Sequence, residues 1–176
     1  MPQINFKLVP ELKPQFEYVF QVIPNGWHLA EILHVKPEFQ PSGVERWTVM
    51  WGIVAGPHKG TAVKDWMHWG DEDDGPRSEQ ALARCKMVCK EIGINTDIAG
   101  PVEIKPENVI GGICYIETRQ KPDKKDPTKV YVNITLCGFR AAPDADISNV
   151  HAEDAQMAMG LSQNPFPEIK DKAIPF

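Results

Sequence analysis

The sequence predicts a mainly β domain of five strands, with one helix inserted between the third strand and the fourth. Two observations predict this fold class: five segments alternate polar and apolar residues with the period of a strand, and one intervening segment has the period of a helix. A chain of 176 residues, 42% of them hydrophobic, is long enough for one such domain and a tail. We therefore divide it into an N-terminal arm at 1–24, a β domain at 25–140 and a flexible acidic tail at 141–176.

The arm contains four prolines, which favour extended backbone over a long helix, although the alternation from Phe16 to Val22 allows one edge strand. Three strands are expected after it, in a meander over 27–36, 46–54 and 61–69. Proline and glycine clusters separate them, because these residues interrupt strand backbone and favour turns.

Strand alternation divides the aromatic residues of the meander into two classes. Trp47 and Trp51 share a face with apolar neighbours and are expected in the core, whereas Lys64, Trp66 and His68 share a polar face of the third strand. Trp66 is therefore the tryptophan expected to be exposed.

The helix is expected to begin at Ser78, a good N-cap, and to end at Gly93. An acidic run at 71–74 precedes it and does not match an EF-hand loop, which needs Gly at position six and Glu at position twelve. Cys85 and Cys89 are expected to lie in a buried apolar stripe of this helix. Zinc binding by these two cysteines is the alternative, but further ligands are not recognisable. The stripe comprises Leu82, Cys85, Val88, Cys89 and Ile92.

Two more strands are expected, over 113–120 and 130–139, joined by a basic hairpin loop at 121–129. The last strand should place Val130, Val132, Ile134 and Leu136 on one face and Tyr131, Asn133 and Thr135 on the other. Three strands, a helix and two strands is the order of a five-stranded OB-fold barrel, which binds oligonucleotides across strands two and three and between its loops.

Single-stranded nucleic acid needs cations for its phosphates and aromatic faces for its bases. The net charge of −5 is unfavourable for such a partner, but residues 1–140 carry 17 Lys and Arg against 18 Asp and Glu, so most of the acidity lies in the tail. Residues 105–140 carry seven basic residues against four acidic ones. The expected binding residues are Arg46, Lys64, Trp66, His68, Trp69, Arg119, Lys121, Lys124, Lys125, Lys129 and Tyr131.

Four segments of the body resemble phage-encoded single-stranded DNA-binding proteins with an OB fold. They are Pro24–Trp27, Gly56–Gly60, Ala83–Gly93 and Gly111–Gly112. The last residues, Ile174, Pro175 and Phe176, resemble the C-terminal tip of bacterial single-stranded DNA-binding proteins, although Lys170 and Lys172 interrupt the acidic run before them. In that family the tip docks on replication and repair enzymes, so the resemblance implies a partner-binding tip.

These observations predict a non-enzymatic, sequence-tolerant single-stranded DNA-binding protein of phage or prophage replication or recombination. It is expected in the bacterial host cytoplasm and away from membranes, because no signal peptide and no run of about 18 apolar residues is present. No cofactor or metal is expected. A homo-oligomer stays open. One alternative is an OB module that binds a protein; another is a metal-dependent hydrolase using His58, His68 and Asp65 or the acidic run, which lack a recognisable ligand spacing.

Overall fold

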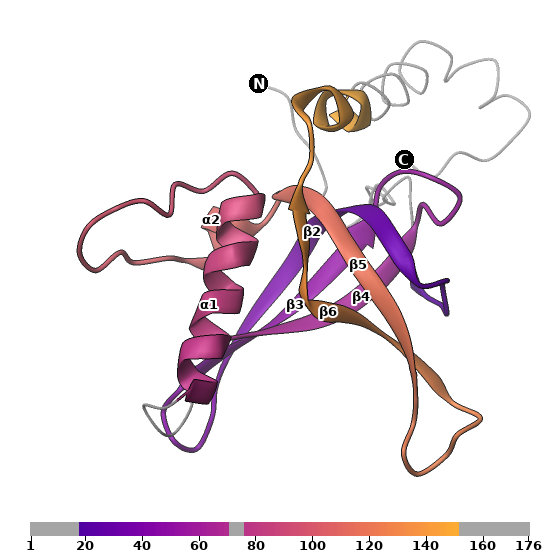
Figure 1. Ribbon diagram of the computed structural model, residues 1–176, viewed down its shortest axis with the longest axis horizontal. Coiled ribbons are helices and arrows are strands. Elements are labelled where there is room, and N and C mark those ends of the chain that lie inside the picture. Colours follow the sequence, from indigo (N-terminus) through magenta and orange to yellow (C-terminus); the bar gives the residue numbers. More distant parts are fainter. Residues whose placement is uncertain (1–17, 71–75, 152–176) are drawn as a thin grey trace, which may run out of the picture. The chain divides into compact units, whose positions relative to one another are not determined.

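The computed structural model describes residues 18–70 and 76–151. Residues 18–147 lie in one compact unit (Figure 1). Residues 148–151 are helical and do not belong to this unit. The acidic run at 71–74, most of the expected arm and most of the expected tail lie outside the described residues.

The compact unit is built on one six-stranded sheet in the order β1-β4-β3-β2-β5-β6 (Figure 1). Neighbouring strands are antiparallel except for β1 and β4, which run parallel. Two helices, α1 and α2, lie between β4 and β5 in chain order. The strands are β1 (Val19–Phe20), β2 (Gly26–Phe39), β3 (Glu45–Ile53), β4 (Thr61–His68), β5 (Ile113–Pro122) and β6 (Val130–Ala141), and the helices are α1 (Pro76–Glu91) and α2 (Pro106–Val109).

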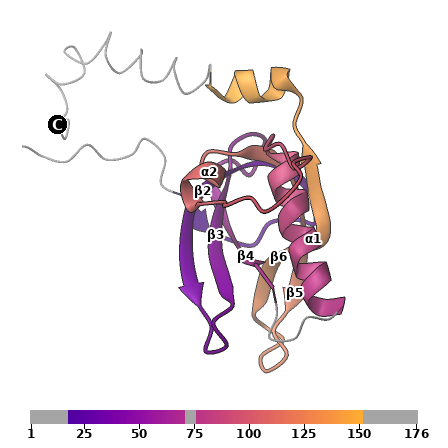
Figure 2. The same cartoon turned by 90° about the vertical axis from the view of Figure 1, so that its left-hand side faces the viewer.

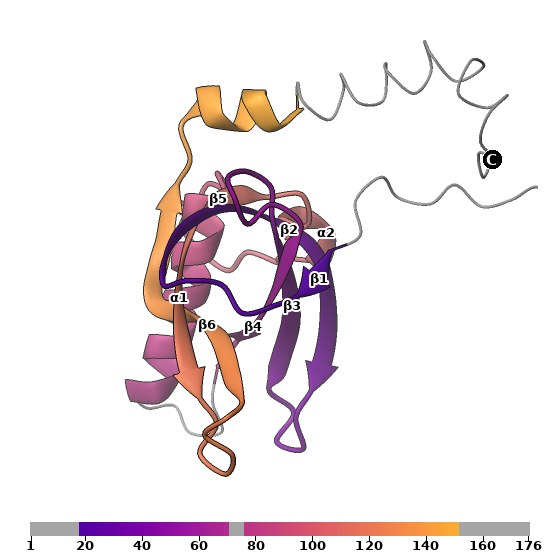
Figure 3. The ribbon, with the colours of Figure 1, turned by 90° about the vertical axis from the view of Figure 1, so that its right-hand side faces the viewer.

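The expectation of a closed five-stranded barrel is wrong in two respects. A sixth strand, β1, pairs Val19 with Thr61 and Phe20 with Ala62, so it occupies the beginning of the edge of β4 that a closing strand would need. Within the described residues, β6 pairs with β5 alone and stays an edge strand. The hairpins β2–β3 and β5–β6 extend to the same end of the unit (Figures 2 and 3).

The core follows the alternation of the strands. Trp47 and Trp51 are buried on β3, as the sequence predicts, and Cys85 and Cys89 pack among them from α1. Apolar burial of this kind is the main favourable term in folding. No helix among the described residues is long and apolar enough to cross a membrane.

Helix α1 differs from the expectation at its beginning. It starts at Pro76 instead of after Ser78, which is buried within the first turn, and it ends at Glu91, with Gly93 in the left-handed conformation at φ +95°. Leu82 is exposed, whereas Cys85, Val88 and Cys89 are buried. The buried stripe is therefore shorter than expected.

Strand β2 continues through Pro37 to Phe39, beyond the expected break. Its pairing with β5 ends at Glu31, and from His34 onward it pairs only with β3. A proline lacks the N–H donor, so it is tolerated where one side of the strand has no neighbour.

The pairing of β6 with β5 shifts in register between Ile116, which pairs with Phe139, and Thr118, which pairs with Ile134. After this shift the side chains of β6 point to the opposite faces from those that simple alternation predicts. Leu136 is exposed and does not share the buried face of Ile134 as expected, and Phe139 lies in the core instead. Gly138 lies in the shifted segment, where a Cβ atom would overlap Thr135 and crowd the backbone of strand β5. A bulge of this kind reverses which side chains face inward.

Candidate functional site

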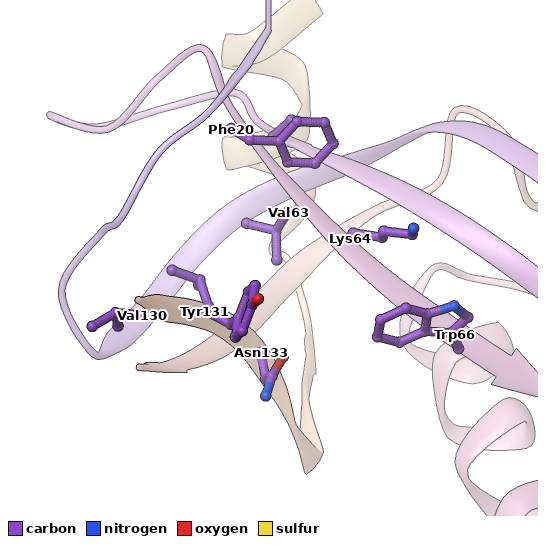
Figure 4. Close-up of a pocket in the computed structure, with 9 residues that line it drawn as sticks. Phe20, Val63, Lys64, Trp66, Val130, Tyr131 and Asn133 are labelled. Carbon is purple, nitrogen blue, oxygen red and sulfur yellow. The ribbon is translucent and has the colours of Figure 1, made fainter. Parts of the chain in front are cut away.

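A groove of about 690 Å³ runs between β4 and β6, on the side where the sheet is not closed (Figure 4). Strand β1 and β4 provide one wall and the beginning of β6 provides the other. The lining residues are Phe20, Ala62, Val63, Lys64, Trp66, Val130, Tyr131, Val132 and Asn133. We refer to this surface as the β4–β6 groove.

The β4 wall carries a cation and an aromatic ring side by side. Burial alternates along β4, so that Val63, Asp65 and Met67 point inward while Lys64 and Trp66 point outward. The Nζ atom of Lys64 lies 5.4 Å from the centroid of the Trp66 ring, within the range of a cation–π contact. Trp66 is nevertheless 39% exposed, as the sequence predicts, so its ring is available to a ligand.

The β6 wall carries Tyr131, which is 52% exposed. Its ring also lines a second hollow of about 440 Å³ in the β5–β6 hairpin, together with Lys121, Lys124 and Lys125. The Tyr131 hydroxyl donates a hydrogen bond of 2.9 Å to Asp123, and this bond raises the pKa of Tyr131. Tyr131 therefore joins the β4–β6 groove to the lysines of the hairpin.

Six of the nine lining residues were not among the expected binding residues, and two of these six, Phe20 and Asn133, carry an aromatic ring or a polar side chain. Phe20 of β1 is 62% exposed and stands on the β4 wall, and Asn133 lies on the β6 wall (Figure 4). The alternation of Phe16 to Val22 indicates an edge strand, but it does not show that this strand pairs with β4 and so brings Phe20 to the groove. Asn133 alternates with Val132 and Ile134, and this pattern indicates its outward position.

The groove continues at its other end into a hollow of about 360 Å³ that Lys64, Trp66 and Asn133 also line. There Arg84 of α1 forms a two-pronged ion pair with Asp65, at 3.0 and 3.1 Å, and donates to the backbone oxygen of Trp66 at 3.0 Å. Burial raises the pKa of Asp65 and Arg84 opposes this effect. His68 reaches the same hollow.

Other expected binding residues are directed elsewhere. Arg46 forms an ion pair of 2.8 Å with Glu38, which lowers the pKa of that carboxyl. Trp69 packs edge to face on Trp47, with ring centroids 4.8 Å apart, and belongs to the rim of the core. These residues do not line the β4–β6 groove.

The remaining expected residues surround the groove on the side of the hairpin. Arg119 of β5 is exposed, lies opposite Asn133 in the β5–β6 register, and contacts Glu117 at 3.5 Å. Lys129 is exposed at the end of the hairpin loop. Arg119 pairs with a groove residue in the sheet and Lys129 directly precedes the first groove residue of β6, but neither lines the groove.

The cysteines at the core are buried thiols. Burial raises the pKa of Cys85 and of Cys114 to about 12, so both are protonated at neutral pH. Cys85 donates a hydrogen bond to the backbone oxygen of His68. Residues 18–70 and 76–151 contain no group of three or more His, Cys, Asp and Glu side chains placed to hold a metal ion.

Comparison with known protein families and with curated proteins found no match for this chain.

Proposed function

We propose that the chain binds single-stranded DNA without sequence preference along the β4–β6 groove. The observation that carries the proposal is the placement of two exposed rings, Trp66 and Tyr131, on opposite walls of one groove that leads into a hollow lined by three lysines. Stacking on such rings contributes about 1–3 kcal/mol per base and tolerates any base.

The fold supports this proposal through the position of the groove. Strands β3 and β4 are the second and third of the five longer strands, and the β5–β6 hairpin joins the last two. OB folds bind oligonucleotides across strands two and three and between the loops that join strands one to two and four to five. The β4–β6 groove shares β4 and the β5–β6 hairpin with that surface, although no residue of β3 lines it, and this overlap supports the proposal.

The electrostatic contribution can be stated as a number. Lys64, Lys121, Lys124 and Lys125 line the groove and the hairpin hollow. Each neutralised phosphate of a single strand contributes about −0.7 to the slope of log K against log salt concentration, so four contacts give a slope of about −3.

The test is a titration of the full chain with oligo-dT, followed by tryptophan fluorescence at several salt concentrations. Quenching of the tryptophan fluorescence and a slope of about −3 are expected. Absence of quenching at low salt, or an affinity that salt does not change, would refute the proposal.

The biological setting belongs to the same proposal. The chain acts in replication or recombination in the cytoplasm of a bacterial host, without catalysing a reaction, and its tip Ile174–Phe176 recruits partner enzymes. The tip lies outside the described residues, so the family resemblance alone supports this part. Deleting residues 152–176 is expected to abolish partner recruitment and to leave oligo-dT binding in place.

A second candidate function is the binding of an extended peptide. In the part of the chain that the structure describes, β6 is an edge strand beside the groove, and an unpaired edge can accept a further strand. This function predicts no affinity for oligonucleotides and loss of assembly when Trp66 is replaced by Ala. The titration above therefore separates the two.

A further inference from the structure

The loop of the β5–β6 hairpin is organised around one carboxylate. Asp123 Oδ1 accepts hydrogen bonds from the backbone N–H groups of Lys125 at 2.7 Å and Asp126 at 3.3 Å. Its other oxygen, Oδ2, accepts the bond from the Tyr131 hydroxyl. One side chain thus holds both the loop backbone and the ring that stands in the groove.

We infer that Asp123 is a positioning residue that fixes Tyr131 and the hairpin lysines in the arrangement that receives the nucleic acid. The inference rests on the proposed function. It explains an acidic residue that lines the same hollow as Lys121, Lys124 and Lys125, where a negative charge opposes phosphate binding. Fixing side chains before binding reduces the conformational entropy lost on association, which corresponds to about a two- to tenfold gain in affinity for each long side chain.

This role and simple electrostatics predict opposite effects for Asp123→Ala. Removing a negative charge from a basic surface should strengthen binding of a polyanion. Losing the three hydrogen bonds releases Tyr131 and the loop, which should weaken it. Asp123→Asn removes the charge but keeps a side-chain oxygen for the backbone N–H groups and an amide that can bond the Tyr131 hydroxyl.

Asp126 offers a matched control in the same loop. Its Oδ1 atom accepts bonds from the Thr128 backbone at 3.1 Å and the Thr128 hydroxyl at 2.5 Å, and it does not line the hollow. Asp126→Asn therefore removes an equal charge close by without releasing Tyr131.

The experiment measures oligo-dT affinity of the full chain for the wild type and these three variants at one low salt concentration. Both Asn variants are expected to bind at least as tightly as the wild type, and Asp123→Ala about two- to tenfold more weakly than Asp123→Asn. If Asp123→Ala binds as tightly as Asp123→Asn, the positioning role is overturned. If the wild type binds no oligo-dT, the proposed function is overturned instead.

A second measurement tests the organisation of the hairpin without DNA. Amide hydrogen exchange of Lys125 and Asp126 should accelerate in Asp123→Ala and stay near the wild-type rate in Asp123→Asn. Unchanged exchange in Asp123→Ala would show that the loop holds its shape without this carboxylate, which also overturns the inference.

Discussion

The ion pair between Arg84 and Asp65 leads to a stability prediction that is independent of any ligand. The two side chains are 13% and 9% exposed, and Arg84 also contacts the Phe139 ring at 4.8 Å. Arg84→Met keeps an apolar stem of similar length but leaves the Asp65 carboxylate buried without its partner. Breaking a buried pair in this way costs about 3–5 kcal/mol of the free energy of unfolding.

The loss should depend on pH, with a definite sign. Burial already raises the pKa of Asp65, and removal of Arg84 takes away the largest opposing effect, so the folded-state pKa rises further above the unfolded one. The folded variant then binds a proton more readily than the unfolded chain. Its stability is greatest below the unfolded pKa and falls as pH rises through the folded pKa.

Urea unfolding at pH 5 and pH 7.5, followed by circular dichroism, measures both effects. With a slope of about 2 kcal/mol per M, the expected loss lowers the midpoint by about 2 M at the higher pH and by less at the lower pH. Asp65→Asn combined with Arg84→Met should recover much of the loss and remove its pH dependence. Lys86→Met, on an exposed position of the same helix, is the control with little expected effect. A loss below about 1 kcal/mol, or an equal loss at both pH values, would contradict the reasoning.

Three further predictions concern single residues. Trp66→Ala should weaken oligo-dT binding by about 1–3 kcal/mol while Trp66→Phe keeps most of the affinity, and equal affinities in a titration would show that no base stacks there. Gly112→Ala should lower the free energy of unfolding by about 1–3 kcal/mol, because a Cβ atom would lie 2.9 Å from the Val109 oxygen; a wild-type melting temperature would contradict this. A thiol reagent should label exposed Cys137 rapidly in the folded protein, and Cys85 and Cys114 only on unfolding. Rapid labelling of Cys85 or Cys114 in the Cys137→Ser variant would count against their burial.

The sequence pattern predicted the strand faces well, because alternation is a local property. Trp47 and Trp51 are buried and Lys64 and Trp66 are exposed, as the period of two requires. The pattern also placed Tyr131 outward on β6. The outward direction of Lys64 and Trp66 on one wall and of Tyr131 on the other could thus be predicted from strand alternation alone.

Contacts between distant segments could not be predicted in this way. The parallel pairing of β1 with β4 joins residues about forty positions apart through two residue pairs, too few to leave a pattern. The inward turn of Trp69 follows from its ring contact with Trp47, and the ion pair of Arg46 depends on Glu38 of the neighbouring strand. The shift in β6 that exposes Leu136 has no counterpart in the hydrophobic periodicity.

The open side of the sheet connects the fold to the proposed function. Among residues 18–70 and 76–151, the only strand that pairs with this edge of β4 is β1, at the first two residues of β4, so from Val63 onward the edge faces the groove. Pairing of β4 with β6 would bring the strands to about 4.8 Å from each other, which leaves no space for a base between Trp66 and Tyr131. The missing pairing that makes the closed barrel wrong therefore provides the room that two stacking rings on opposite walls require.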